Sequence, residues 1–219
     1  PCANGAAMDR ICVPTHVIDL SAPAKLRWVS LLRERRRDAL RVHRAVLDLV
    51  AARCPWLVRW LGPWTLWLCA AKIRHLDEMQ SIAAELGVPV ADVVLFQVAI
   101  EMFACSTSIV VLPGRHQHTV DWPLDVLRDI TVSVNFVRSG CVVANATTWI
   151  GYVGILTGMT QHLSCSVNFP SDATASDWDV LRGGRQTVGQ LVREVLLDGA
   201  GSYDDALRRI RDAPLIARA

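Results

Sequence analysis

Residues 96–112 read FQVAIEMFACSTSIVVL, and the chain changes character within this stretch. The segment Val90–Phe103 carries apolar residues at helical spacing along one side, namely Val94, Val98 and Met102. From Thr107 to Leu112 the residues are mainly β-branched or apolar, which is typical of a strand, and a Pro-Gly turn signal follows. The stretch therefore predicts a helix that leads into a strand through the junction of Cys105 and Ser106.

The residues before this junction are predicted to be mainly helical. Residues 14–20 alternate enough to form a short strand, and a helical stretch follows over residues 22–52. Another helix is expected over residues 73–86, with Gly87 as its C-terminal stop. Its expected inner face consists of Leu76, Met79, Ile82 and Ala83. Residues 1–104 are therefore expected to form a helical region.

The residues after the junction are predicted to form strands and then helices. Two strand candidates, residues 130–137 and 141–148, are joined in a hairpin-like way. A third strand and two amphipathic helices follow over residues 163–168, 187–197 and 204–210. This order predicts an α+β fold in which residues 105–219 form a second region.

Composition and charge narrow the classes of function. The chain has 219 residues, of which 52% are hydrophobic, and this is too apolar for a disordered protein. A net charge of only +2 gives no electrostatic case for a nucleic-acid partner. The basic run at residues 33–37, with His43 and Arg44 close behind, is either a patch for anionic lipid headgroups or a solvated helix face. The six histidines show no H-E-x-x-H or comparable metal-binding spacing, so no metal site is expected.

Four of the eight tryptophans recur at helical spacing: Trp56, Trp60, Trp64 and Trp67. A membrane-spanning helix is not expected here, because the apolar run is shorter than the roughly 20 residues required and Arg59, Gly62 and Pro63 interrupt it. Tryptophan favours the membrane interface, where its ring is in an apolar medium while its N–H stays hydrated. The stripe is therefore either a membrane-surface contact or a part of the core.

Cysteines and one short motif indicate a secretory route. Seven cysteines leave one unpaired under oxidising conditions, and a disulfide from Cys2 or Cys12 would anchor the N-terminal segment. Asn145-Ala146-Thr147 is an N-glycosylation sequon. The chain begins at Pro1, as expected for either the mature end of a processed protein or a fragment.

Several segments resemble the family of acid ceramidase and N-acylethanolamine-hydrolysing acid amidase, and they follow one another in the same order as in that family. The segments are Val17–Leu20 with Arg27-Trp28, residues 77–84 and 87–89, residues 96–110, Gly151–Gly158 and Ser202–Ala206. The resemblance implies an N-terminal-nucleophile hydrolase with an αββα sandwich, which cuts its own chain immediately before the nucleophile. The freed α-amine, with a pKa of about 8, then serves as the general base. The resemblance also implies a lipid amide substrate and a lysosomal or secreted protein.

The nucleophile is either Ser106 or Cys105. An ungapped match from Phe96 to Val110 puts Ser106 at the position of the family's cysteine. Using Cys105 requires an extra residue, which would exchange the two faces of the following strand. Three explanations fit a serine at this position. It is a natural hydroxyl nucleophile, or the match to the family is displaced by one residue and Cys105 is the active residue, or it is an engineered replacement that slows self-cleavage.

Other expected site residues match the family only in part. Asp121 matches the family's aspartate and is expected to orient the nucleophile's amine, whereas His118 stands where the family has arginine. His118 is either its functional replacement or a turn residue, since imidazole lacks arginine's permanent fork of donors. A family glutamate is missing after Asn168, and the family continues beyond Ala219 with further strands. We therefore expect an incomplete sandwich with an exposed sheet edge.

The sequence leaves three functions open. The first is hydrolysis of a ceramide or an N-acylethanolamine, in which a fatty acid is released. The second is an inactive or truncated homologue that binds lipid or a partner without catalysis. The third is a different acyl substrate, such as a penicillin or a conjugated bile acid, and the tryptophan stripe argues against it.

Overall fold

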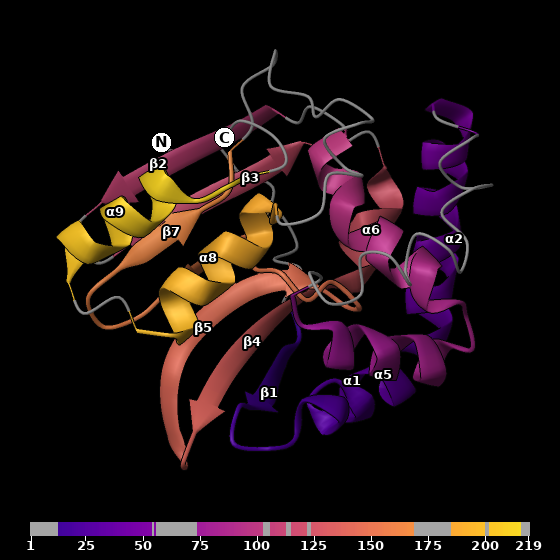
Figure 1. The fold of residues 1–219 in the computed structure, drawn as a ribbon, viewed down its shortest axis with the longest axis horizontal. Helices are drawn as coiled ribbons and strands as arrows, with labels where there is room; N and C mark the ends of the chain where they lie inside the picture. The colour runs from indigo at the N-terminus through magenta and orange to yellow at the C-terminus, as the bar shows by residue number, and fades with distance from the viewer. Residues whose placement is uncertain are drawn as a thin grey trace, which may run out of the picture.

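The computed structural model of the chain describes residues 13–53, 55, 74–102, 106–112, 115–121, 124–168, 185–199 and 202–215. Within these residues, helices and strands are both abundant, and a five-stranded sheet stands beside a separate two-stranded one (Figure 1). The predicted α+β class is confirmed.

The five-stranded sheet has the order β1-β4-β5-β6-β7. Its strands are β1 (Thr15–Asp19), β4 (Thr131–Arg138), β5 (Cys141–Trp149), β6 (Thr157–Met159) and β7 (Ser164–Ser166). β1 pairs with β4 in parallel, and the other neighbours are antiparallel. Four of these strands were predicted. β6 was not, because three residues that include a glycine give no strand signal.

The turn between β4 and β5 is the predicted hairpin. Ser139 and Gly140 have φ angles of 51° and 80°, and both values lie in the left-handed region. A two-residue loop with positive φ at both positions matches the twist of antiparallel strands. Glycine adopts this conformation without a steric penalty, so the local sequence determines where the hairpin turns.

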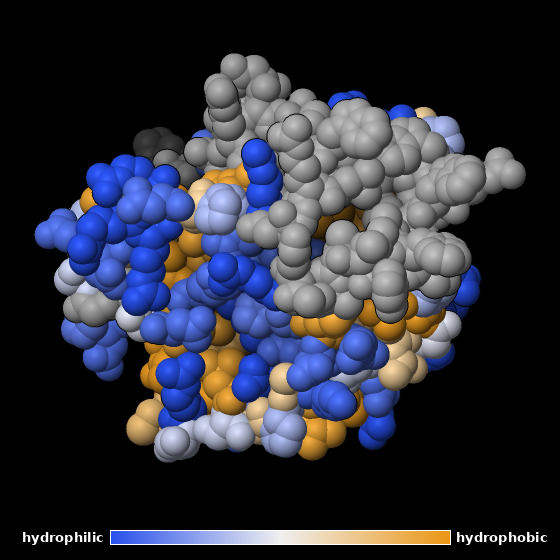
Figure 2. All heavy atoms as spheres, in the orientation of Figure 1, coloured by the Kyte–Doolittle hydropathy of each residue, from blue (hydrophilic) through white to orange (hydrophobic). Residues whose placement is uncertain are grey.

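Most of the described helices share one buried core with the five-stranded sheet. They are η1 (Ala24–Leu26), α1 (Val29–Glu34), α2 (Arg36–Arg53), α5 (Leu76–Leu86), α6 (Val90–Met102), η3 (Asp125–Ile130), α8 (Val188–Leu197) and α9 (Tyr203–Asp212). Gly87 ends α5 with a φ of 72°, as predicted, and its N–H donates to the Ala83 carbonyl. Thr187 begins α8 with a capping box that includes Gln190. Over α9 the surface is almost wholly hydrophilic (Figure 2).

The two faces of the five-stranded sheet differ. On β4, Val132, Val134 and Phe136 are fully buried in one core with the helices. The intervening Ser133 and Asn135 are only half-buried, and Asn145 of β5 is exposed. One face therefore packs against helices, whereas the other, which we call the open face, is not covered by the described residues.

α6 is buried most deeply on a different side from the one that carries Val94 and Val98. Val94 and Val98 are half-buried, whereas Val93, Phe96 and Gln97 are buried. The reason is that α6 is apolar on all sides, so hydrophobic spacing could not indicate which side faces the core.

Several arginines of the basic run bond to other parts of the fold. Arg33 makes two bonds to the Glu85 carboxylate, and Arg36 donates to the Glu85 and Leu86 carbonyls at the C-terminal end of α5. Arg35 donates to the Asp129 carbonyl. Cations are favoured at helix C-termini, so this part of the run joins α1 and α2 to their neighbours.

No single described helix is both long and apolar enough to cross a membrane. α5 and α6 together meet the length and composition needed, but they are bent by 114° relative to each other. The tryptophan stripe at residues 56–67 lies outside the described residues, as do Cys2, Cys12 and Cys105. The described cysteines, Cys141 and Cys165, are both free thiols.

Candidate functional site

The candidate active site begins with a hairpin of two strands. β2 (Ser106–Leu112) and β3 (Arg115–Asp121) form the two-stranded antiparallel sheet, seen side by side in Figure 1. Their register pairs Ser106 with Asp121 at one end and Leu112 with Arg115 at the other. The hairpin thus brings the first residue of β2 directly opposite the last residue of β3.

His118 lies at a different register position, and Cys105 lies outside the described residues. His118 pairs with Ile109, three positions along β2 from Ser106. The hairpin therefore brings Ser106 and Asp121 together in register but not His118, and the catalytic roles of all four residues stay predictions.

A buried irregular loop, residues 151–156, packs against the helix that leads to Ser106. All six residues are buried, so their backbone polar groups require partners inside the protein. Gln97 of α6 donates to the Gly151 carbonyl at 2.9 Å and accepts from the Val153 N–H at 2.7 Å. Thr148 of β5 donates to the Gly154 carbonyl at 2.8 Å. The loop is therefore held by side chains from both the helical and the sheet side.

Glycines allow this loop to approach α8 closely. A Cβ atom at Gly189 would lie 2.1 Å from the Tyr152 hydroxyl oxygen, and one at Gly154 would lie 2.6 Å from the Tyr152 ring. The Ile155 N–H donates to the Gly189 carbonyl at 2.9 Å. Glycine is required at both positions because any side chain would overlap the buried tyrosine. This contact explains part of the Gly151–Gly158 motif.

A buried ion cluster lies next to the loop. Glu78 of α5 is 1% exposed and Arg193 of α8 is 3% exposed, and two hydrogen bonds of 2.7 and 2.8 Å join them. Arg27 and the Trp28 indole N–H add bonds of 2.8 and 2.6 Å to the same carboxylate. Arg193 also donates to the Val153 carbonyl at 2.9 Å. The cluster therefore connects α5, α8 and the loop.

These contacts determine the charge state of Glu78. Burial alone would raise the pKa of its carboxyl group, but the hydrogen bonds and charge of Arg193, with those of Trp28 and Arg27, outweigh burial and lower the pKa to about 2. Burial lowers the pKa of His75 to about 4, helped by the charge of Arg193, and burial alone does the same for His43. Glu78 is therefore charged and both histidines are neutral near pH 7.

The sequence did not predict these buried polar residues. Gln97 and Arg193 interrupt apolar helical segments, and Glu78 directly precedes the inward-facing Met79. A lone charged or amide side chain within such a segment is a usable signal. Its partner is far away along the chain, however, and no local spacing identifies it.

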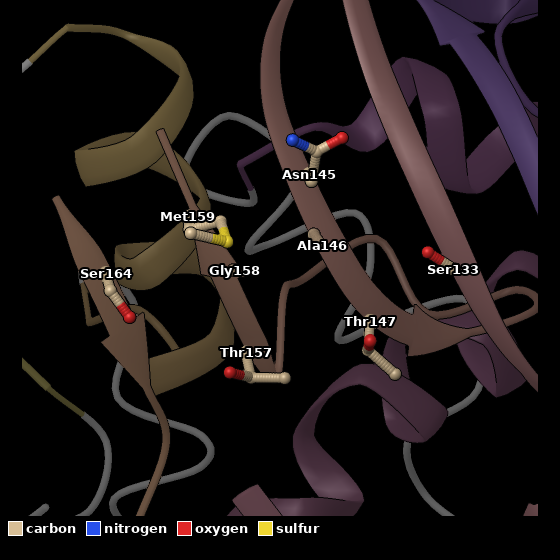
Figure 3. A pocket seen from close by; sticks show the side chains of 8 residues that line it. All are labelled: Ser133, Asn145, Ala146, Thr147, Thr157, Gly158, Met159 and Ser164. Carbon is tan, nitrogen blue, oxygen red and sulfur yellow. The ribbon is translucent and has the colours of Figure 1, made fainter. Parts of the chain in front are cut away.

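An open pocket of about 150 Å³ lies on the open face of the sheet. Figure 3 shows hydroxyl and amide side chains around it from four strands, together with Met159: Ser133, Asn145, Thr147, Thr157 and Ser164. The Thr157 and Ser166 hydroxyls are 2.7 Å apart and share a hydrogen bond. Nothing charged lines the pocket, and within the described part of the chain no group of three or more His, Cys, Asp or Glu residues could hold a metal ion.

Comparison with known proteins gives one family. Residues 12–68 match a family model described as the beta subunit of N-acylethanolamine-hydrolyzing acid amidase. This match lies within the predicted helical region of residues 1–104, and the boundary at residue 104 stays a prediction.

Similar proteins of known name cover most of this chain. N-acylethanolamine-hydrolyzing acid amidase of Mus musculus is 28% identical over 222 residues, which are 93% of this chain and 58% of the relative. The enzyme of the same name from Oryctolagus cuniculus is 30% identical over 87% of this chain and 55% of the relative. Acid ceramidase of Mus musculus is 28% identical over 94% of this chain and 59% of the relative. The chain thus spans a little over half the length of the curated relatives it matches.

Proposed function

We propose, on the premise that this chain belongs to the family of N-acylethanolamine-hydrolysing acid amidase and acid ceramidase, that it hydrolyses lipid N-acyl amides and releases a fatty acid. Relatives named as amidase and ceramidase match about nine-tenths of the chain. The observation that carries the proposal is the register of the β2–β3 hairpin, in which Ser106 lies opposite Asp121. This is the pairing that a nucleophile and a carboxylate orienting its amine require.

The proposed activation step is a cut before Ser106. The Ser106 Oγ attacks the carbonyl carbon of Cys105, the peptide C–N bond breaks, and the hydroxyl proton passes to the departing nitrogen. Water then hydrolyses the resulting ester, which gives a carboxyl group on Cys105 and a free α-amine on Ser106. Asp121 holds that amine beside the hydroxyl that it activates.

The proposed turnover of substrate uses the Ser106 hydroxyl and the freed α-amine of the same residue. The Ser106 Oγ attacks the amide carbonyl of the substrate, and the α-amine takes the hydroxyl proton and delivers it to the leaving nitrogen. An acyl-enzyme ester remains. Water, deprotonated by the α-amine, hydrolyses this ester and releases the fatty acid, so the step uses no cofactor.

Contacts across the cut support this activation scheme. β1, from the part before residue 105, pairs along five residues with β4, from the part after it. The Glu78–Arg193 ion pair and both Gln97 loop contacts also cross the cut. A chain cut before Ser106 would keep these buried contacts and remain one folded body.

The family fold would add a second sheet to the open face. That layer conflicts with a glycan on Asn145, because Asn145 lies on this face with β4 on one side and β6 on the other. We give the sandwich precedence, since a three-residue sequon often occurs by chance. We therefore expect that the protein, secreted from eukaryotic cells, loses no mass at Asn145 on treatment with a peptide N-glycosidase. Asn145→Gln is the control, and a glycan absent only from that variant would contradict the second sheet.

A lysosomal or secreted location and a membrane-surface role for Trp56, Trp60, Trp64 and Trp67 are also part of this proposal. The word acid in the names of the relatives supports the location. A substrate with a long acyl chain must leave a lipid phase, which suits an interfacial tryptophan stripe.

Intact mass and turnover test the proposed function. After acid incubation the wild type is expected to separate, on denaturation, into fragments cut before residue 106, and to hydrolyse a fluorogenic N-acyl amide. Ser106→Ala is expected to stay whole and to lose activity by about 10³-fold or more, since removal of a nucleophile has effects of that order. Cys105→Ala is expected to keep both properties. The reverse pattern would assign Cys105, and equal turnover by all three proteins would exclude this site.

A lipid-binding homologue without catalysis is the second candidate. His118 stands in place of the family's arginine, and it pairs with Ile109 rather than with a residue next to Ser106. A wild-type chain that stays whole and inactive but binds vesicles of the lipid amide would favour this function.

A further inference from the structure

Gln97 is a buried amide whose two ends are both used. It lies in α6, is 1% exposed, and bonds to the Gly151 carbonyl and the Val153 N–H. Its Nε2 also donates to the Val93 carbonyl of its own helix at 3.2 Å. Burying an amide is unfavourable unless both ends are bonded, so α6 has one preferred position on the loop.

The loop in turn is fixed to the rest of the fold. Arg193 of α8 donates to the Val153 carbonyl, and Thr148 of β5 donates to the Gly154 carbonyl. The Ile155 N–H is bonded to the Gly189 carbonyl. Because two elements, α8 and β5, hold the loop, Gln97 transmits their position to α6.

α6 leads directly to the proposed cut. It ends at Met102, and β2 begins at Ser106. From Gln97 to Met102 a helix extends about 7 Å, too short a length to bend appreciably. A displacement at Gln97 therefore reappears at Met102, four residues before Ser106 in the sequence. The cut requires the Ser106 hydroxyl to align with the Cys105 carbonyl.

We propose that Gln97 is a positioning residue for self-cleavage before Ser106, an inference that rests on the proposed function. Gln97 acts through the backbone and does not touch the reacting atoms. Misplacing reacting groups by about 1 Å is enough to slow a reaction by about 100-fold. Thr148 bonds to the same loop from β5, but this bond does not fix the position of α6.

The test compares two variants that each remove buried bonds to the same loop. Gln97→Met keeps an unbranched side chain of similar length, and Thr148→Val keeps the shape of threonine. Both are expected to lower the Tm. Only Gln97→Met is expected to slow the cut, by about 10- to 100-fold, and to increase amide hydrogen exchange over residues 98–112.

Gln97→Glu adds a pH readout. A protonated carboxyl group offers one donor and one acceptor and so replaces both amide contacts, whereas the ionised form has no donor for the Gly151 carbonyl. Its cutting rate relative to wild type is expected to rise as the pH falls. This variant also serves if Gln97→Met does not fold.

Different results overturn the two proposals. Equal slowing by Gln97→Met and Thr148→Val, or unchanged exchange over residues 98–112 in Gln97→Met, would overturn the positioning role. A wild-type chain that is never cut would overturn self-cleavage, and the exchange comparison would still decide whether Gln97 positions the end of α6.

Discussion

Glu78→Gln is expected to destabilise the folded chain by about 3–5 kcal/mol, the effect of removing one partner from a buried ion pair. The glutamine is nearly isosteric, so it fills the same space and leaves no cavity. It removes the negative charge that compensates Arg193, which is 3% exposed, and Arg27. It also presents an N–H group to side chains that are themselves donors. Urea unfolding at pH 7, followed by circular dichroism, measures the loss.

Glu85→Gln is the matched control. Glu85 lies on the same helix and also bonds to an arginine through both oxygens, at 2.8 and 2.9 Å. That pair is exposed, so water screens its charges and replaces its hydrogen bonds when it is lost. A much smaller loss is expected than for Glu78→Gln. Equal losses would mean that burial of the Glu78 cluster has no energetic consequence.

Removing both charges of the Glu78–Arg193 pair separates the energetic effect of pairing the charges from that of burying them. Glu78→Leu combined with Arg193→Leu is expected to lose less stability than the sum of the two single variants, because no charge of this pair remains without its partner. The double variant should still be less stable than the wild type. Arg27 and the Trp28 indole would still lack their acceptor, and the Val153 carbonyl would lack the Arg193 donor.

Sequence signals predicted the features that depend on neighbouring residues. The β4–β5 hairpin follows from two strand runs and the Ser139-Gly140 pair, and the end of α5 follows from Gly87. The strand predicted over residues 107–112 also formed, as β2, whereas its partner strand β3 was not predicted. In each case the signal and the structure lie within about fifteen residues of chain, where spacing and turn chemistry determine the outcome.

Features that depend on distant residues were not predicted. The parallel pairing of β1 with β4 joins residues more than 100 positions apart, and Glu78 meets Arg193 across 115 positions. Hydrophobic periodicity carries no information about such partners. The sequence also did not indicate which side of α6 is buried, because an evenly apolar helix gives no direction and the position of Gln97 depends on the loop at 151–156.

Acidification is expected to weaken the fold in two separate pH ranges, and His43 is the clearer cause of the first. Burial lowers the pKa of His43 from 6.5 to about 4, so the unfolded chain binds its proton at a higher pH than the folded chain. Stability is therefore complete above about pH 6.5 and falls as the pH drops towards 4. The shift corresponds to about 3 kcal/mol at most. His75, whose pKa is lowered in the same direction, adds to this loss.

Glu78 acts in the second range. Its pKa is lowered to about 2, so its contribution is present above about pH 4.5 and is lost only as the pH falls from there towards 2. Between about pH 6.5 and 4.5 the folded chain thus keeps the Glu78 cluster while its buried histidines weaken the fold. Unfolding free energies measured by urea at closely spaced pH values separate the two ranges.

His43→Leu tests the assignment of the first range. His43 packs against the Phe96 ring, with centroids 5.6 Å apart, so a leucine can occupy this apolar site without introducing a titrating group. The variant is expected to lose less stability than wild type between pH 6.5 and 4.5, by about 2 kcal/mol. His162→Gln is the control, because the exposed His162 is surrounded by solvent in both states. If His43→Leu follows the wild-type profile through this range, the acid sensitivity arises from another group.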